Sequence, residues 1–495
     1  MLHTNPFTIN RRSFLKGCAS FSAFATLRGF GITNMVFEPA HAQATNVNVA
    51  QPTADNRDLL VYVFVRGGMD GLNVVTPFNT SKEDTDLYYN QLRRNVNIPA
   101  PNSGAARTLV DLDGRFGLHP DAARAPGNAA HPDASDQGGL YQVFTKGDLA
   151  IVHATGSPYI TGSHFDSELY VDLGRTSGDS GWITRYLQAI NAPEQALIVA
   201  PQQAVPPSLA GTYGALTVPR ADNFGPVWSN TGDPYNNSVI AKQRDLLLAT
   251  YGHTDDFVSL VGRRAFTAFD ALSPVLAQPY TPAGHYLVSD WTPDGGTFGQ
   301  AMMTIARIAK ANLAEPLRVA CVDVGGGYDT HDNEGTVDWD GNPRFPQLVM
   351  NLANNLKAFY DDMNADATWR GRFTVVVLSE FGRVLYENNS GGCDHGYGNI
   401  MFVMGSGGNI NGGHVYGNWP GLRNFGFNDG LQITTDYRLV LTDILLGRLG
   451  VSAAQLSTVF PGFTPGALLG IAKPAVQAAA SAPLSEQIFL PTIRR

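Results

Sequence analysis

Acidic residues and histidines of this sequence gather in short, glycine-rich segments such as GGGYDTHDNEG and GGCDHGYGN. Carboxylates mixed with imidazoles suit Zn²⁺, Mn²⁺ or Fe better than Ca²⁺, which takes oxygen ligands only. Glycines fit such a site, because a loop around an ion must bring its backbone close and adopt positive φ. The candidate metal ligands are Asp70, Asp329, His331, Glu380 and His395.

Each candidate ligand has an ordinary structural alternative. An Asp beside Gly, such as Asp70, is usually a turn residue whose carboxylate accepts backbone hydrogen bonds. The Asp329-Thr-His331 segment fits a surface Asx-turn equally well. A lone His395 is more often a hydrogen-bonded loop or core residue than a ligand. A metal centre is favoured because all these segments border strands at the same expected edge of a sheet.

A serine at an expected helix start offers a different role. In YITGSHFDSELYVDLG, Ser163 has the type and position of an N-cap. The same position faces free N–H groups, where an anionic ester would bind and a metal could make the hydroxyl a nucleophile. His164 could instead bind metal or an anion. Arg66 and Arg383 could clamp a phosphate or sulfate, the alternative being an ordinary ion pair with Asp or Glu.

The elements that must position these residues indicate an α/β protein. Short apolar runs rich in β-branched residues predict strands that need cover on both faces, with helical patterns between them. Strands alternating with helices predict a doubly wound, mainly parallel central sheet flanked by helices. The strand signals start near residues 59, 149, 196, 317, 373 and 400, and the helical patterns at 182, 236 to 274, 299, 345 and 434 or 435.

The N-terminal segment predicts export. Paired Arg11 and Arg12 precede a modestly apolar stretch, and AHAQA gives a cleavage signal that ends at Ala42. The alternative is a basic tail on a short core helix. Because the stretch is too weak to span a bilayer, we expect a periplasmic or secreted protein with no membrane segment after leader removal.

Domain organisation and charge limit the expected partners. We expect a twin-arginine signal peptide over residues 1–42, a linker over 43–58, a single α/β domain over 59–465 and a C-terminal tail over 466–495. The formal net charge of −9 argues against nucleic acid or an anionic membrane as a partner. After the leader, Cys321 and Cys393 remain, and their spacing leaves open whether they pair.

Seven segments resemble, in the same order, a family of twin-arginine-exported bacterial proteins of unknown function within the alkaline phosphatase and sulfatase superfamily. They are RRSFLKG, RGGMDGLNVV, SHFDSELYVDLG, DVGGGYDTHDNEG, LSEFGRVLYENNSGGCDHGYGN, TTDYRLVLTDILLGRLG and VFPGF, and they reach to about residue 463. The resemblance implies two divalent metals at the carboxyl edge of a doubly wound sheet, with Ser163 as the nucleophile. It implies ligands at Asp70, Asp329, His331 and His395.

One position departs from the superfamily pattern. Glu380 is followed by Phe381 where many relatives carry an Asp-His pair, so one nitrogen ligand is missing. Asp394 or His164 would have to replace it, or only one ion binds. The sequence thus predicts an exported hydrolase of phosphate or sulfate esters that uses one or two Zn²⁺ or Mn²⁺ ions and takes a small anionic ester. The alternative is an exported binding or assembly protein, with an exported partner protein and an incomplete metal site.

Overall fold

The computed structural model describes residues 58–474, apart from 82–83, 85–88, 124–138, 160, 192–196, 203, 212–214, 219–233, 253–256, 290–291, 315, 326, 336–343 and 424–426. The expected signal peptide, the linker up to residue 57 and the tail from residue 475 lie outside the described residues. Among the helices that the structure does describe, none combines the length and apolar character needed to cross a membrane.

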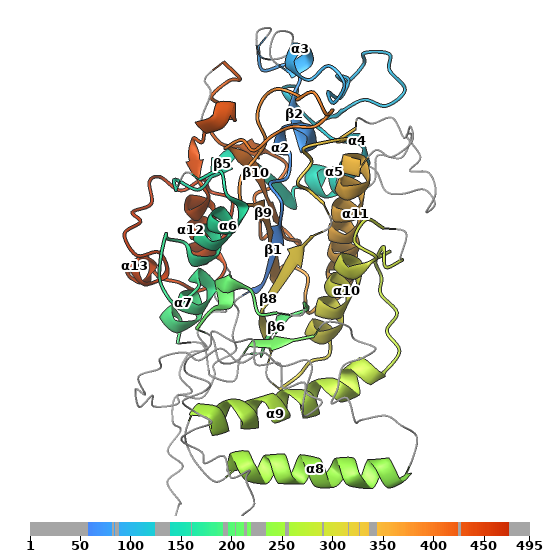
Figure 1. Ribbon diagram of the computed structural model, residues 1–495, viewed down its shortest axis with the longest axis vertical. Coiled ribbons are helices and arrows are strands. Elements are labelled where there is room, and N and C mark those ends of the chain that lie inside the picture. The colour runs from blue at the N-terminus through green and yellow to red at the C-terminus, as the bar shows by residue number, and fades with distance from the viewer. Residues whose placement is uncertain are drawn as a thin grey trace, which may run out of the picture.

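A nine-stranded sheet forms the centre of the molecule, in the order β11-β5-β10-β9-β1-β8-β6-β7 with β12 beside β5 (Figure 1). β1 lies between β8 and β9 and is parallel to both, and β6 continues the parallel part. Only β10 runs antiparallel to its neighbours β9 and β5 within this described sheet. The predicted mainly parallel sheet is therefore confirmed. The strands are β1 Leu59–Val65, β5 Leu149–Gly156, β6 Leu197–Ala200, β7 Ala215–Thr217, β8 Leu317–Val324, β9 Phe373–Ser379, β10 Asn399–Met404, β11 Val415–Tyr416 and β12 Thr435–Asp436.

Helices cover both faces of this sheet, as the apolar runs predict (Figure 1). Because successive side chains of a strand point to opposite faces, Leu59, Val61 and Val63 of β1 enter one core while Leu60 and Tyr62 enter the other. The first core packs against α4 Pro120–Ala123, α5 Gly139–Thr145, α9 Phe257–Ala277, α10 Thr297–Lys310 and α11 Arg344–Ala365. The second packs against α6 His164–Leu173, α7 Trp182–Ala189, α12 Tyr437–Gly447 and α13 Leu456–Val459.

Smaller elements complete the fold. A three-stranded antiparallel sheet follows β1, and α8 packs against α9 as a helical hairpin beyond the edge of the main sheet (Figure 1). The remaining elements are α2 Gly71–Val74, β2 Val75–Pro77, α3 Asn90–Leu92, β3 Val110–Asp111, β4 Phe116–Leu118 and α8 Pro234–Gly252, with 3-10 turns at Pro207–Leu209, Phe427–Asp429 and Ala453–Gln455.

One helix prediction needs correction. The last long helix, α12, begins at Tyr437 because Thr435 and Asp436 pair with β5 as strand β12. Its N-cap is Asp436, whose carboxylate accepts the backbone N–H of Arg438 at 2.9 Å. The helical stretch expected from about residue 236 to residue 274 is confirmed, and it consists of two helices, α8 and α9.

The carboxyl ends of β1, β8 and β9 lie side by side, and the loops that follow them come close together. Gly67 and Gly68 have φ values of 108° and 61°. A Cβ atom at Gly67 would lie 2.9 Å from the backbone nitrogen of Asp329, and one at Gly68 would lie 2.5 Å from the ring of Phe381. Glycine at both positions therefore lets the loop after β1 lie directly against the loops after β8 and β9.

Candidate metal centre

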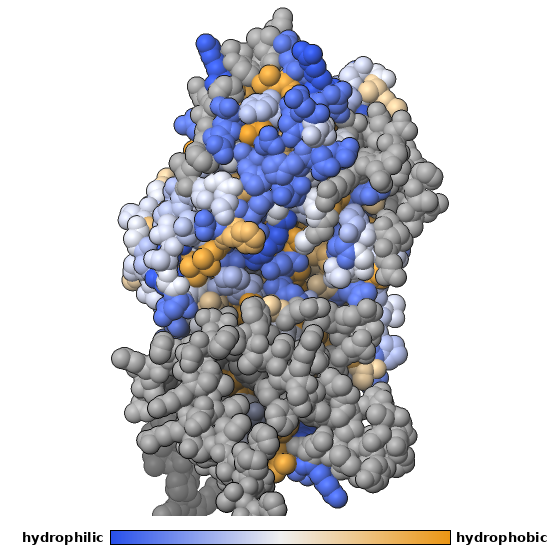
Figure 2. All heavy atoms as spheres, viewed as in Figure 1, coloured by the Kyte–Doolittle hydropathy of each residue, from blue (hydrophilic) through white to orange (hydrophobic). Residues whose placement is uncertain are grey.

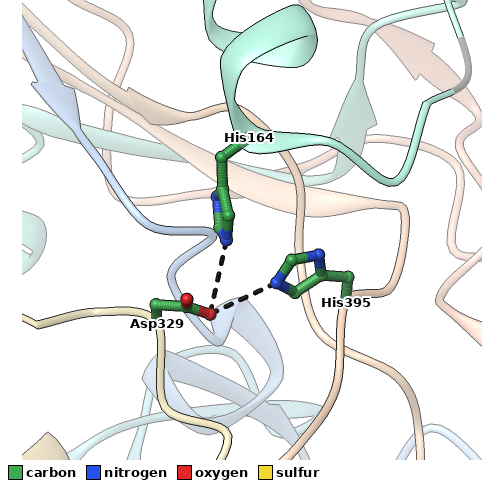
Figure 3. A group of neighbouring side chains, drawn as sticks. All are labelled: His164, Asp329 and His395. Carbon is green, nitrogen blue, oxygen red and sulfur yellow. Dashed lines mark hydrogen bonds and ion pairs between the residues drawn. The ribbon is translucent and has the colours of Figure 1, made fainter.

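Three histidines bring their Nε2 atoms to one carboxylate oxygen, Oδ1 of Asp329 (Figure 3 shows two of them). His331 Nε2 lies 3.0 Å from this oxygen, and the Nε2 atoms of His164 and His395 each lie 3.3 Å from it. The Nε2 atoms of His331 and His395 are 2.8 Å apart. Tetrahedral ligands about 2.0–2.1 Å from zinc lie about 3.3–3.4 Å from one another. The four distances above, between 2.8 and 3.3 Å, are close to this spacing, and ligand atoms of His164, Asp329 and His395 all lie within 4.8 Å of one another.

Each of the three imidazole rings has its other nitrogen, Nδ1, beside a fixed acceptor. A carboxylate or carbonyl oxygen can only accept, so the proton is assigned to Nδ1 on each ring and the Nε2 lone pair faces Asp329. Metal-ligating histidines in proteins are oriented in this way. The acceptors are Glu380 Oε1 at 2.6 Å from His164, Asp394 Oδ1 at 2.7 Å from His331, and the carbonyl of Gly162 at 2.9 Å from His395.

The Nε2 atom of His164 has an unmet bonding need. It is buried and makes no hydrogen bond with any residue that the structure describes. An unsatisfied buried polar atom destabilises a protein by about 1–3 kcal/mol. A divalent cation among the four donor atoms would take this lone pair. The rings of His164 and His395 also pack against Phe381, at centroid distances of 4.8 and 4.9 Å, which restricts their rotation.

The carboxylate of Asp329 carries its charge throughout the neutral pH range. Partial burial favours the neutral acid, but the hydrogen bond from Arg383 at 2.7 Å and its positive charge outweigh burial and lower the pKa of Asp329 to about 2. Arg383 is itself buried, and it donates to the carbonyls of Gly67, Gly68, Tyr328 and Cys393. One guanidinium thereby holds together the loops that surround the histidines.

Glu380, an expected ligand, accepts hydrogen bonds behind the histidines. Its Oε1 accepts from the backbone N–H of Gly67 at 2.8 Å as well as from His164, and its Oε2 accepts the hydroxyl of Ser379 at 2.9 Å. These bonds occupy three of the roughly four lone-pair sites of the carboxylate. In this arrangement Glu380 orients His164, whose Nε2 lies near Asp329, and ligand atoms of Glu380, His164 and Glu168 also lie within 4.8 Å of one another.

Asp70 lies in a separate, buried group rather than with the histidines. Its carboxylate accepts the N–H of Leu72 at 3.2 Å, which caps α2, and it forms an ion pair with the fully buried Arg93. Glu334 and Cys393 each place a ligand atom within 4.8 Å of this carboxylate. Because Arg93 already supplies the positive charge, Asp70 has the structural role that was the alternative for a turn aspartate.

Ser163 and Arg66 also take the structural roles weighed above. The hydroxyl of Ser163 accepts the N–H of Asp166 at 3.4 Å, so Ser163 is the N-cap of α6. Arg66 pairs with three carboxylates instead of facing the histidines as a free clamp. They are Glu168 at 3.2 Å, Asp172 at 2.9 Å and Asp323 at 3.0 Å.

Sequence reasoning missed several contacts of this region. The hydrogen bond between His395 and the Gly162 carbonyl could not be predicted from residue types, because it involves a backbone atom. The contact of Asp394 with His331 could have been predicted, since Asp394 precedes His395 and was already a candidate ligand. The pairing of Arg93 with Asp70 across a loop was also missed. Cys321 and Cys393 are both buried and free, so they do not form a disulfide.

Comparison with known proteins gives a family match over part of the chain. Residues 283–434 match the family described as Protein of unknown function (DUF1501). This segment contains Asp329, His331 and His395, and His164 lies before it. No curated protein sequence matches the chain.

Several solved structures share a low similarity with the chain. One is the C-terminal periplasmic domain of EcEptC from Escherichia coli in complex with Zn, with 12% identity and a TM-score of 0.32 over 88% of this chain and 96% of that one. Another is alkaline phosphatase from the Antarctic bacterium TAB5, with 10% identity and a TM-score of 0.26 over 72% and 93%. A third is Ps i-CgsB in complex with k-i-k-neocarrahexaose, with 9% identity and a TM-score of 0.33 over 81% and 74%. The fold assignment rests on the sheet itself.

In the metal-free protein, the imidazoles of His164 and His395 are expected to titrate on opposite sides of the ordinary histidine value of about 6.5. The hydrogen bond to Glu380 raises the pKa of His164, and burial lowers the pKa of His395. Because the folded-state pKa of His164 is raised, the stability from its contact with Glu380 is complete below about pH 6.5 and is lost as pH rises through the folded-state pKa. NMR titration of the ring nitrogens measures both values.

The Glu380→Gln variant is the control for this titration. It should bring the pKa of His164 down toward about 6.5, since the amide keeps the size of the side chain and removes its charge. The pKa of His395 should rise slightly, because His164 would carry less positive charge beside it. Equal titration of His164 in the wild-type and variant proteins would contradict the orienting role of Glu380.

Proposed function

We propose that the protein is an exported metal-dependent hydrolase of phosphate or sulfate esters, with one zinc ion held by His164, His331, His395 and Asp329. The observation that carries the proposal is the convergence of three Nε2 atoms on Asp329 Oδ1. Three imidazoles favour Zn²⁺ over Mn²⁺, which prefers oxygen ligands. When bound, zinc supplies Lewis acidity, which polarises an ester oxygen and stabilises charge on the attacking and leaving oxygens.

The chain itself positions the donors and leaves one side accessible. Glu380 and Asp394 hold the Nδ1 protons of two rings, so those rings keep their Nε2 lone pairs available. Arg383 keeps Asp329 charged and fixed in place. Because four protein ligands would complete a tetrahedral zinc shell, an ester would have to bind as a fifth ligand. The side chains of Asp329 and His331 remain 45% and 41% exposed, so an ester can approach from solvent.

The proposed export rests on the N-terminal sequence. The paired Arg11 and Arg12 and the AHAQA site support a twin-arginine leader that is removed after Ala42. In this proposal the mature enzyme acts in the periplasm or outside the cell, as one catalytic domain over residues 59–465. Twin-arginine export carries folded chains, which agrees with loading of the metal before export.

Metal content and turnover test the proposed function together. Protein purified from the exported fraction should contain about one zinc per chain by elemental analysis. It should hydrolyse at least one member of a panel of aryl phosphate monoesters, aryl phosphodiesters and aryl sulfates. A chelator should stop this activity and added zinc should restore it. A purified protein that binds no zinc when zinc is supplied would refute the metal centre.

Ser163 is the proposed nucleophile, and its capping role allows a matched test. Asparagine caps a helix about as well as serine but has no hydroxyl, whereas alanine removes both functions. We expect Ser163→Ala to lose about 1 kcal/mol of unfolding free energy and Ser163→Asn to lose almost none. Both variants should lose more than about 100-fold in kcat if the hydroxyl attacks the ester.

An unchanged kcat in both variants would remove Ser163 from the mechanism. If Ser163→Asn keeps wild-type kcat while Ser163→Ala loses only stability, the hydroxyl serves as an N-cap alone. The attacking group would then be water. Zinc content measured on each sample separates a loss of metal from a loss of the nucleophile.

A second candidate function is an exported binding or assembly protein in which the metal is structural. Phe165 and Leu169, one turn apart on α6 beside His164, are 85% and 39% exposed, and apolar surface is seen near α6 (Figure 2). Exposed apolar side chains that cluster on a surface are typical of partner contacts. Stoichiometric zinc without hydrolysis of any ester in the panel would favour this candidate.

A further inference from the structure

We infer that the site prefers esters with a single negative charge, which are phosphodiesters and sulfate monoesters, over phosphate monoesters, which are dianions at neutral pH and above. This inference rests on the proposed function and specifies its substrate. It follows from how Arg383, which contacts Asp329, and Arg66, which pairs with three nearby carboxylates, are already used.

Arg383 has no exposed surface to offer a substrate. Its side chain is 0% exposed although Asp329, its partner, is 45% exposed. Its N–H groups point to four backbone carbonyls and to Oδ1 of Asp329. An ester oxygen would have to displace these bonds to reach the guanidinium. Arg383 therefore neutralises Asp329 and cannot also bind a second anionic charge.

Arg66 is outnumbered by its carboxylate partners. Glu168, Asp172 and Asp323 all pair with this one guanidinium. Burial raises the pKa of all three carboxyls, that of Asp172 to about 7, so Asp172 is mostly ionised at pH 8 and three acidic groups face one guanidinium. Glu168 and Asp323 are 21% and 31% exposed, so their charge reaches the solvent side. This acidic wall is defined by Glu168, Asp172 and Asp323.

The acidic wall lies next to the metal centre. Ligand atoms of Glu168, Glu380 and His164 lie within 4.8 Å of one another. A further carboxylate, that of Asp394, accepts a hydrogen bond from Nδ1 of His331. The Asp394 side chain is 51% exposed. An ester at the centre would thus have carboxylates near more than one of the histidines. Each added negative charge on the ester is opposed by them, and like charges placed close together disfavour a ligand strongly.

Steady-state kinetics at pH 8 on the zinc-loaded protein test the preference. The substrates are bis(p-nitrophenyl) phosphate, p-nitrophenyl sulfate and p-nitrophenyl phosphate. We expect kcat/KM for at least one of the first two to exceed that for the monoester by more than about tenfold. The larger of the two values shows whether the enzyme is a phosphodiesterase or a sulfatase. A monoester that is hydrolysed as well as both would overturn the inference and leave the proposed function intact.

A binding measurement keeps the inference testable without turnover. Phenylphosphonate is a dianion at pH 8, and its monomethyl ester has almost the same shape with one charge fewer. Calorimetry with the zinc-loaded protein should show tighter binding of the monomethyl ester. Equal or tighter binding of phenylphosphonate, or binding of neither compound, would overturn the inference. Inactivity toward every ester refutes the proposed function separately.

Two variants connect the preference to the acidic wall. Glu168→Gln and Asp323→Asn each remove one charge, and each should narrow the ratio between diester and monoester kcat/KM by more than about threefold. The matched control is Asp270→Asn on α9, which removes an exposed carboxylate that pairs with Arg244. The control should leave the ratio unchanged. A ratio that is the same in all four proteins would show that the wall does not set the preference.

Discussion

Replacement of His395 by alanine is expected to lower zinc affinity more than about 100-fold and to abolish ester hydrolysis while the chain stays folded. The change removes one of the four donor atoms around the proposed ion. Loss of a residue that only orients a metal ligand already lowers affinity about 10–100-fold, so loss of a ligand should exceed that range. Competition with a chromogenic chelator measures the affinity, and the absorption spectrum of the cobalt-substituted protein reports the coordination.

An exposed histidine outside the centre is the control. His414 contacts Tyr416 through its ring and lies on the surface, so His414→Ala should keep one zinc per chain and full activity. The His395 ring is only partly buried, and its known bonds are to the Gly162 carbonyl and the centre itself, so its loss should change stability little. An alanine variant at His395 that binds zinc with wild-type affinity would show that the four donor atoms do not form one site.

The strands and the edge at which the centre lies could be predicted from the sequence for a simple reason. Continuous apolar runs of β-branched residues, such as the one that begins at Leu59, are needed where both faces of a strand are buried. Adjacent parallel strands then bring their following loops to one edge. This is why Asp329, His331 and His395 were expected together and do lie together.

The roles of other residues depend on details that spacing does not contain. Whether Glu380 binds an ion or orients a ring is decided by the direction of its two oxygens, which face Gly67, Ser379 and His164. His164 follows the N-cap of α6, and its Nε2 points toward Asp329. The same sequence would also fit a helix whose first histidine points into solvent. Arg66 follows β1 at the same edge, and only the tertiary structure shows that carboxylates from other segments occupy it.

The charged groups near the carboxyl edge thus fall into two kinds. The histidine centre is partly exposed, contains a buried nitrogen without a hydrogen bond and has its rings held by neighbouring groups, which are features of a functional site. The group around Asp70 is fully buried and already contains its own cation, Arg93. Such a group contributes to folding through the balance of its charges, so removal of the cation should destabilise the protein.

Replacement of Arg93 by alanine is expected to lower the free energy of unfolding by about 3–5 kcal/mol. Arg93 is fully buried, pairs with Asp70 and donates to the carbonyls of Val384 and Leu385. Burial, followed by the charge of Asp70, raises the pKa of Glu334 well above its ordinary value. Without the guanidinium, a charged carboxylate remains buried with no cation. Urea unfolding at pH 7 measures the change.

The neighbouring arginine provides the matched control. Arg94 is exposed, and within the described residues its side chain donates a hydrogen bond to the nearby carbonyl of Gln91 at 3.2 Å. Replacement of Arg94 by alanine should therefore change the free energy of unfolding by less than about 0.5 kcal/mol. The double variant Arg93→Met and Asp70→Asn separates charge from packing, because asparagine still caps α2 and neither residue is charged. It should recover at least half of the loss caused by Arg93→Ala. A double variant no more stable than Arg93→Ala would mean that the contacts of Arg93 with the Val384 and Leu385 carbonyls, and not its charge, hold this part of the fold together.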